Sequence, residues 1–187
     1  LDGRIEMIVD GGPVEIGVES TILDMTVTPP MILRPGAVTR EMLEELIGEV
    51  AVDQTLLKAD SRTAPKAPGM KYRHYAPKAN LVVVEGEVEK VTAWIRETAA
   101  TKQQEGKRVG IIATEETKES YPDGDVKVAG TRADEATIAS SLYGILREFD
   151  GDGVDEIYSE AFASGGIGAA VMNRLLKAAG HQVIRIT

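Results

Sequence analysis

The feature that most constrains the fold is a regular alternation of short apolar runs with segments of helical spacing over residues 81–187. The runs that predict strands are 81–84, 108–113, 125–129, 156–158 and 183–186, and the segments that predict helices are 88–105, 135–149 and 167–179. Apolar strands that alternate with helices are typical of a parallel sheet covered on both faces. The sequence therefore predicts an α/β fold: a Rossmann-like domain of about five strands with helices on both faces.

Composition narrows the chemistry of this chain. Hydrophobic residues make up 43% of the sequence and aromatic residues only 4%, so the core must consist mainly of aliphatic side chains. The absence of cysteine excludes disulfides and thiolate metal sites, and it is compatible with a reducing, cytoplasmic location. Only His74 and His181 could serve as histidine ligands, so no protein-bound metal is expected.

Charge and hydropathy limit the partners. The net charge of −9 argues against direct RNA binding, because affinity for a phosphate backbone comes from Lys and Arg that displace counterions. No apolar run approaches the roughly 20 residues that a bilayer span needs, so no membrane partner is expected. We expect small polar or phosphorylated ligands instead, held by local basic groups.

Residues 1–48 predict a second, smaller α/β unit. Strands are expected at 5–9, 17–24 and 31–34, and a helix over 40–47 begins after a capping threonine and ends at a glycine. Three strands and one helix are too few for an independent core. We therefore expect this unit to be the closing part of a larger domain whose earlier strands precede Leu1.

Residues 49–80 predict an interdomain linker, since Pro65, Pro68 and Pro77 oppose both a helix and a central strand. Extended at roughly 3.3 Å per residue, residues 63–80 could cover about 60 Å. This segment contains Lys71, Tyr72, Arg73, His74 and Tyr75, which are residue types that could clamp a nucleotide through phosphate contacts and ring stacking. The alternative is a strip that merely docks the linker on a domain surface.

Three further sites carry residues suited to small ligands. Ser20 and Thr21 could bind an amino-acid carboxylate or a phosphate, although strand propensity and a turn also explain them. Arg34, directly before Pro35, suits a phosphate because its planar fork binds two oxygens, although a surface ion pair is the alternative. The glycine-rich stretch 164–168 could present backbone amides to an anion, but a tight turn is the better interpretation.

Five blocks in the same order carry a resemblance to a known family. The run 68–77 resembles the interdomain linker of the two-domain threonylcarbamoyl-AMP synthases. The blocks 8–12, 17–22 and 32–36 resemble the closing strands of the YrdC-like catalytic domain of that family, and 164–175 is similar to its C-terminal Rossmann-like domain. The resemblance covers essentially the whole chain. It implies domains at 1–48 and 81–187, joined by the linker 49–80.

The resemblance implies an activity and site residues. Such enzymes condense L-threonine, bicarbonate and ATP, with Mg²⁺ accompanying the ATP, into threonylcarbamoyl-AMP and pyrophosphate, and the product feeds threonylcarbamoyladenosine modification of tRNA by partner proteins. By resemblance, Ser20 contacts threonine, Arg34 holds nucleotide phosphate, and Tyr72 reaches the nucleotide from the linker. His74 and Tyr75 would be further linker contacts.

One departure from the family limits the expected activity. The Lys, the Arg and the Ser-x-Asn motif that the family uses are not found in this chain, so no catalytic residue is assigned and the chain alone is expected to be inactive. In the complete protein, the linker would act as a lid over the ATP and threonine pocket. The alternative is a non-enzymatic module in which the Rossmann-like domain senses a nucleotide or binds a protein.

Overall fold

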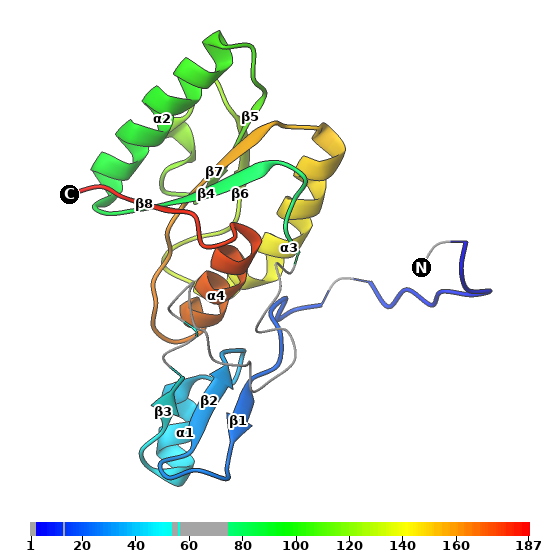
Figure 1. The fold of residues 1–187 in the computed structure, drawn as a ribbon, viewed down its shortest axis with the longest axis vertical. Helices are drawn as coiled ribbons and strands as arrows, with labels where there is room; N and C mark the ends of the chain where they lie inside the picture. Colours follow the sequence, from blue (N-terminus) through cyan, green and yellow to red (C-terminus); the bar gives the residue numbers. More distant parts are fainter. Residues whose placement is uncertain (1–2, 13, 54–55, 57–74) are drawn as a thin grey trace.

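The computed structural model describes residues 3–12, 14–53, 56 and 75–187 (Figure 1). The elements in chain order are β1 (Ile22–Asp24), β2 (Met31–Arg34), α1 (Arg40–Ile47), β3 (Ala51–Val52), β4 (Asn80–Glu85), α2 (Val88–Gln104), β5 (Val109–Ala113), η2 (Lys118–Ser120), β6 (Asp125–Val128), α3 (Glu135–Asp152), β7 (Glu156–Glu160), α4 (Gly168–Ala178) and β8 (Val183–Arg185). No helix of the described ranges is both long enough and apolar enough to cross a membrane.

The C-terminal part contains a five-stranded, fully parallel sheet in the order β6-β5-β7-β4-β8. This confirms the predicted Rossmann-like α/β domain with about five strands. The strand order is a finding of its own, because β7 enters the sheet between β5 and β4, both of which precede it in the chain. The parallel pairing of β7 with both neighbours places the carboxyl ends of all three strands at one edge.

The two faces of this sheet form two separate cores. Leu81 and Val83 of β4 belong to the core that α3 and α4 cover, and Val82 and Val84 belong to the core that α2 covers. Neighbouring residues of a strand point to opposite faces, so a strand buried on both sides must be apolar throughout. Helices therefore lie on both faces, as predicted, with α2 opposite α3 and α4 (Figure 1).

The N-terminal part forms a small sheet in the order β1-β2-β3, in which β1 is antiparallel and β3 parallel to β2. Helix α1 follows β2. The Thr39 side chain caps the helix by accepting a hydrogen bond from the Met42 backbone N–H at 3.3 Å, and Gly48 ends the helix with φ +80°. Strand β3 lies within the range 49–80 that the sequence assigns to the linker, and Val50 beside it is fully buried.

Two predicted strands need correction. Residues 5–9 are not a strand, and the side chains of Met7, Ile8 and Val9 are exposed. Apolar alternation predicts only that a segment can pair, and no strand of the described ranges pairs with this one. The strand predicted over 17–24 begins only at Ile22, because residues 17–19 dock on the C-terminal domain instead: Val18 packs against the core beneath α3 and α4.

Candidate functional site

Two of the predicted site residues, Ser20 and Arg34, lie in direct contact. Arg34 is the last residue of β2, and its Nε donates a hydrogen bond to the Ser20 carbonyl oxygen at 2.9 Å. One Nη of the same guanidinium donates to the Ser20 hydroxyl at 3.0 Å. The antiparallel pairing of β1 with β2 produces this proximity, since Ile22 lies opposite Arg34. A hydroxyl and a guanidinium thus form one polar pair at the edge of the small sheet.

The chain after Arg34 runs very close to the Ser20 segment. A Cβ at Gly36 would lie 2.3 Å from the Glu19 carbonyl oxygen and 2.4 Å from the Thr21 amide nitrogen. Such distances are too short for any other residue type, so glycine is required at this position. The Thr21 hydroxyl also donates to the Val38 carbonyl oxygen at 2.7 Å. Ser20 is therefore held between backbone contacts on both sides.

The C-terminal domain contributes Arg174 to the same region. Its guanidinium, on α4, donates to the Gly17 carbonyl oxygen, and its Nε lies 3.4 Å from a carboxylate oxygen of Glu19. The Arg174 side chain is only 7% exposed. A buried guanidinium is stable only beside compensating groups, which here are a carbonyl and a carboxylate from the segment directly before Ser20.

Tyr75, predicted as a linker contact, lies against Arg174. The Arg174 guanidinium carbon is 4.8 Å from the centre of the Tyr75 ring, and this ring meets the ring of Tyr143 edge-on at 5.2 Å. Arg147 on α3 donates to the carbonyl oxygens of Tyr75 and Ala76 at 3.0 and 3.1 Å. The linker end is therefore fixed on α3 and α4. Two further predicted linker residues, Tyr72 and His74, lie outside the described residues.

A second basic residue of α4, Lys177, interacts electrostatically with the region of the Ser20–Arg34 pair. Burial lowers the pKa of Lys177, Glu19 acts in the opposite direction, and Arg34 lowers it further. The pKa of His181 is lowered by burial and then by Lys177. Glu19, which precedes Ser20, and Arg34 thus both influence the pKa of Lys177 in the C-terminal domain. Arg34 and Lys177 bring two cations to this region, and cations attract an anionic ligand.

A cavity of about 400 Å³ lies between the two parts of the chain. It is lined on one side by residues of β2 and the start of α1, including Ile32 and Thr39, and on the other by Gly166 and Asn173 of the C-terminal domain. Most of its lining is apolar. Pro35 and Gly36, directly after Arg34, belong to its wall, so the polar pair lies beside this cavity.

The glycine-rich turn 164–168 does bind anions, but they are carboxylates of this chain. The Gly168 amide donates to Glu135 at 2.9 Å. The pKa of Glu41 is lowered by a hydrogen bond from its own amide, then by Thr39, and also by the Gly166 amide. A Cβ at Gly168 would lie 2.5 Å from the Ala163 carbonyl oxygen, which also supports the interpretation as a tight turn.

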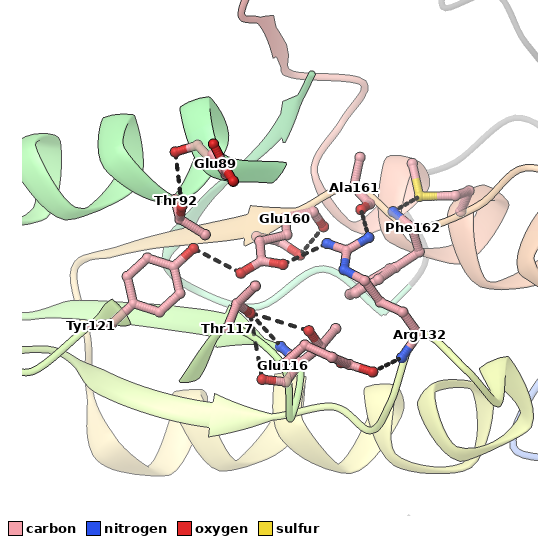
Figure 2. Close-up of polar contacts among 12 residues, drawn as sticks. Glu89, Thr92, Glu116, Thr117, Tyr121, Arg132, Glu160, Ala161 and Phe162 are labelled. Carbon is pink, nitrogen blue, oxygen red and sulfur yellow. Dashed lines mark hydrogen bonds and ion pairs between the residues drawn. The ribbon is translucent and has the colours of Figure 1, made fainter. Parts of the chain in front are cut away.

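In such folds, ligands usually bind at the carboxyl edge of the parallel sheet. The position is the point where the helices that follow two adjacent strands lie on opposite faces of the sheet. Here this point lies at β7. Helix α4, which follows β7, covers one face, and helix α2, which connects the neighbouring strands β4 and β5, covers the other. Glu160, at the end of β7, is fully buried and accepts from the Tyr121 hydroxyl at 2.7 Å and from Arg132 at 2.5 Å. Figure 2 shows Tyr121 and Arg132 pointing at this carboxylate from opposite sides. Burial and Glu160 raise the pKa of Tyr121, which stays a donor.

The chain's own side chains therefore fill the position where a Rossmann-like domain would hold a nucleotide. Around it, Glu116 accepts from the Arg132 amide at 2.9 Å (Figure 2). It also accepts from the Thr131 hydroxyl at 2.5 Å. Carboxylates at this edge disfavour phosphate groups. The arrangement gives no support to a nucleotide sensor in this domain. In the described ranges, no group of three His, Asp or Glu residues is placed to hold a metal ion.

The fold and the site define a class: a two-part α/β protein whose Rossmann-like domain docks on the end of a small sheet that carries a Ser–Arg pair. Comparison with known proteins specifies the family. The family model described as the C-terminal domain of threonylcarbamoyl-AMP synthase matches residues 38–180. The chain belongs to this family, which confirms the resemblance carried by the sequence blocks.

Individual relatives extend the likeness along the whole chain. The threonylcarbamoyl-AMP synthases of Bacillus subtilis (strain 168) and Pyrococcus abyssi are 49% and 46% identical over 99% and 98% of this chain. The crystal structure of the P. abyssi Sua5 protein complexed with L-threonine superposes with a TM-score of 0.87 at 43% identity, over 99% of this chain and 52% of that one. The chain spans about half the length of the curated relatives it matches.

Sequence reasoning missed Arg174. A signal for it exists, because Ala170, Val171, Leu175 and Ala178 predict the buried face of a helix by their spacing, and Arg174 falls on that face. A charged residue on an apolar face is almost never left unpaired. The sequence thus indicates a partner for Arg174, although only the structure identifies Gly17 and Glu19.

Proposed function

We propose that this chain is the C-terminal half of an L-threonylcarbamoyladenylate synthase. The complete enzyme condenses L-threonine, bicarbonate and ATP into threonylcarbamoyl-AMP and pyrophosphate, and its product serves the modification of tRNA. The support is the family membership, together with relatives of that name at 46–49% identity over almost the entire chain. The observation that carries the site is the doubly bonded Ser20–Arg34 pair.

In this proposal, Ser20 binds threonine and Arg34 binds nucleotide phosphate. The Ser20 hydroxyl is exposed to an incoming ligand and is oriented by Arg34. Among the described residues no carboxylate forms an ion pair with Arg34, so none of them neutralises its positive charge. Adjacent sites of this kind would place the carbamate, formed from bicarbonate on the threonine amino group, beside the α-phosphate of ATP. Attack of that carbamate oxygen on the phosphate, with pyrophosphate leaving, is the adenylation step. Mg²⁺ would enter with the ATP.

The linker would act as the lid of this pocket. Tyr75 and Ala76 are fixed on α3 and α4, so the residues before them start from an anchored end next to Arg174 and the Ser20 segment. In the proposal, Tyr72 reaches the nucleotide from this anchored strip, with His74 as a further contact. A closed lid would protect a labile carbamate intermediate from water.

The proposal is tested by pyrophosphate release from ATP in the complete protein, measured with and without L-threonine and bicarbonate. We expect release that depends on both substrates, and no release from the 187-residue chain alone. The variant Tyr72→Ala should reduce turnover or ATP affinity, whereas the control Arg185→Lys, in an exposed pair on β8, should change neither. Pyrophosphate release that does not depend on threonine would contradict the synthase function. Unchanged turnover and ATP affinity in Tyr72→Ala would contradict the role of the linker as a lid.

A further inference from the structure

Arg174 contacts three parts of the chain that are far apart in the sequence. The first part is the segment 17–19, where it donates to Gly17 and lies beside Glu19, and the other two parts are Tyr75 and Tyr143, whose rings it faces. Its guanidinium carbon is also 5.6 Å from the centre of the Tyr143 ring, so it lies between two aromatic residues. Through this one buried side chain, the linker end and the segment before Ser20 share a binding partner.

The Gly17 contact is rigid. The φ angle of Gly17 is +64°, and a Cβ there would lie 2.3 Å from the Ala139 carbonyl oxygen and 2.5 Å from the Ser140 Cα on α3. The backbone of the segment therefore rests directly on the C-terminal domain. Val18 adds to this contact by packing against the core. A displacement of Arg174 would act on the next residues, Glu19 and Ser20, rather than be absorbed at Gly17.

The Glu19 contact, in contrast, has room to tighten. The Arg174 Nε is buried and lacks a hydrogen-bond partner among the described residues, although a Glu19 oxygen lies 3.4 Å away. Charge-assisted N–H···O bonds usually span about 2.7–2.9 Å. A small shift of the Glu19 side chain would complete this bond and satisfy a buried donor.

From these contacts we propose that Arg174 is a positioning residue for threonine: it couples the linker end at Tyr75 to the position of Glu19 and hence of Ser20. The rings of Tyr75 and Tyr143 hold the guanidinium between them, and the guanidinium in turn fixes Glu19. This inference rests on the proposed function, since its main effect is measured as threonine affinity. It adds to that function a contribution of the C-terminal domain to substrate binding.

The test compares two arginines that hold the same linker end in the complete protein. Arg147 donates to the carbonyls of Tyr75 and Ala76, and in the part of the chain that the structure describes it has no hydrogen bond or ion pair to the segment before Ser20. Arg174 binds that segment and also lies against Tyr75. We expect Arg174→Gln to raise the KM for threonine about tenfold with little change in kcat, as for the loss of a charged hydrogen bond that acts on binding alone. Arg147→Gln loosens the linker end alone, so it should raise the KM for threonine clearly less than Arg174→Gln does.

The conservative variant separates charge from geometry. Arg174→Lys keeps the charge and the fold but loses the planar fork and the stacking on Tyr75, so we expect it to raise the KM for threonine as well. This variant also decides the question if Arg174→Gln fails to fold. A wild-type KM in Arg174→Lys, or an equal rise in the Arg147→Gln and Arg174→Gln enzymes, would overturn the inference.

A readout that does not require activity distinguishes failure of the inference from failure of the proposed function. In the 187-residue chain, amide hydrogen exchange over residues 17–21 should accelerate in Arg174→Gln and stay unchanged in Arg147→Gln. If the complete protein lacks threonine-dependent pyrophosphate release but this exchange pattern holds, the synthase function fails and the coupling stands. Equal exchange rates over residues 17–21 in both variants would contradict the coupling itself.

Discussion

Arg34 and Ser20 are joined twice, since the guanidinium donates to both the carbonyl oxygen and the hydroxyl of the serine at 2.9 and 3.0 Å. A lysine in place of Arg34 carries the same charge but lacks the fork that makes both bonds. We expect Arg34→Lys to raise the KM for ATP about tenfold in the complete protein. A lysine that still contacts Ser20 would lose one charge-assisted hydrogen bond to the nucleotide phosphate. The exposed pair of Arg185 with Glu85 offers a control, Arg185→Lys, which should be silent.

The Gly17 contact predicts a strong effect of a single methyl group. Gly17→Ala places a Cβ against the α3 backbone in a left-handed conformation, so we expect a loss of stability of about 2 kcal/mol. Gly144→Ala on the same helix is the matched control, since its Cβ would meet nothing within 4 Å, and it should stabilise by up to about 1 kcal/mol. Urea unfolding of the chain measures both, and equal effects would contradict the docking.

The buried carboxylate at the sheet edge should matter more than an exposed one. Glu160→Gln removes the charge that Arg132 and Tyr121 bind, and we expect a loss of about 2 kcal/mol, which is typical of a hydrogen bond to a charged group. Glu85→Gln breaks the exposed pair with Arg185 and should cost less than about 1 kcal/mol. The comparison requires only denaturant unfolding of the two variants. A larger loss in Glu85→Gln would refute this account of the edge.

Glu116 predicts an acid sensitivity. Its pKa is lowered to about 2, chiefly by the hydrogen bond from Thr131 and despite the opposing effect of burial. A folded-state pKa below the ordinary value of 4.5 means that the unfolded chain binds the proton first. Its contribution to stability is therefore complete above about pH 4.5 and is lost as the pH falls towards 2. Melting temperatures from pH 2 to 6 should show this loss reduced in Thr131→Val, and identical profiles would exclude Glu116 as its source.

The C-terminal domain was predictable because its signals are local. Strands such as β4 are apolar on both faces, and the helices between them show helical spacing, so each element could be recognised from a few consecutive residues. The order of the strands was not predictable. The placement of β7 between β5 and β4 depends on which helix covers which face, and no single segment encodes that.

The two incorrect strands failed for one physical reason. Residues 5–9 and 17–21 have the composition of strands, but a strand exists only if a neighbour satisfies its backbone groups. In the first case no such neighbour lies in the described ranges. In the second, docking of Gly17 and Val18 on the C-terminal domain competes with pairing and prevails. The short strand β3, which pairs with β2, was missed because two residues give no periodicity.

The site divides in the same way. The sequence by itself determined that Ser20 and Arg34 are suited to polar and anionic ligands, since a hydroxyl and a guanidinium keep their chemistry in any fold. Only the tertiary structure decided that they touch, through the pairing of β1 with β2, and that Arg174, from more than 150 residues away in the chain, supports their segment. The reason is that chemical character belongs to a single residue, whereas a site depends on distances, and these are fixed only when the two parts of the chain pack together.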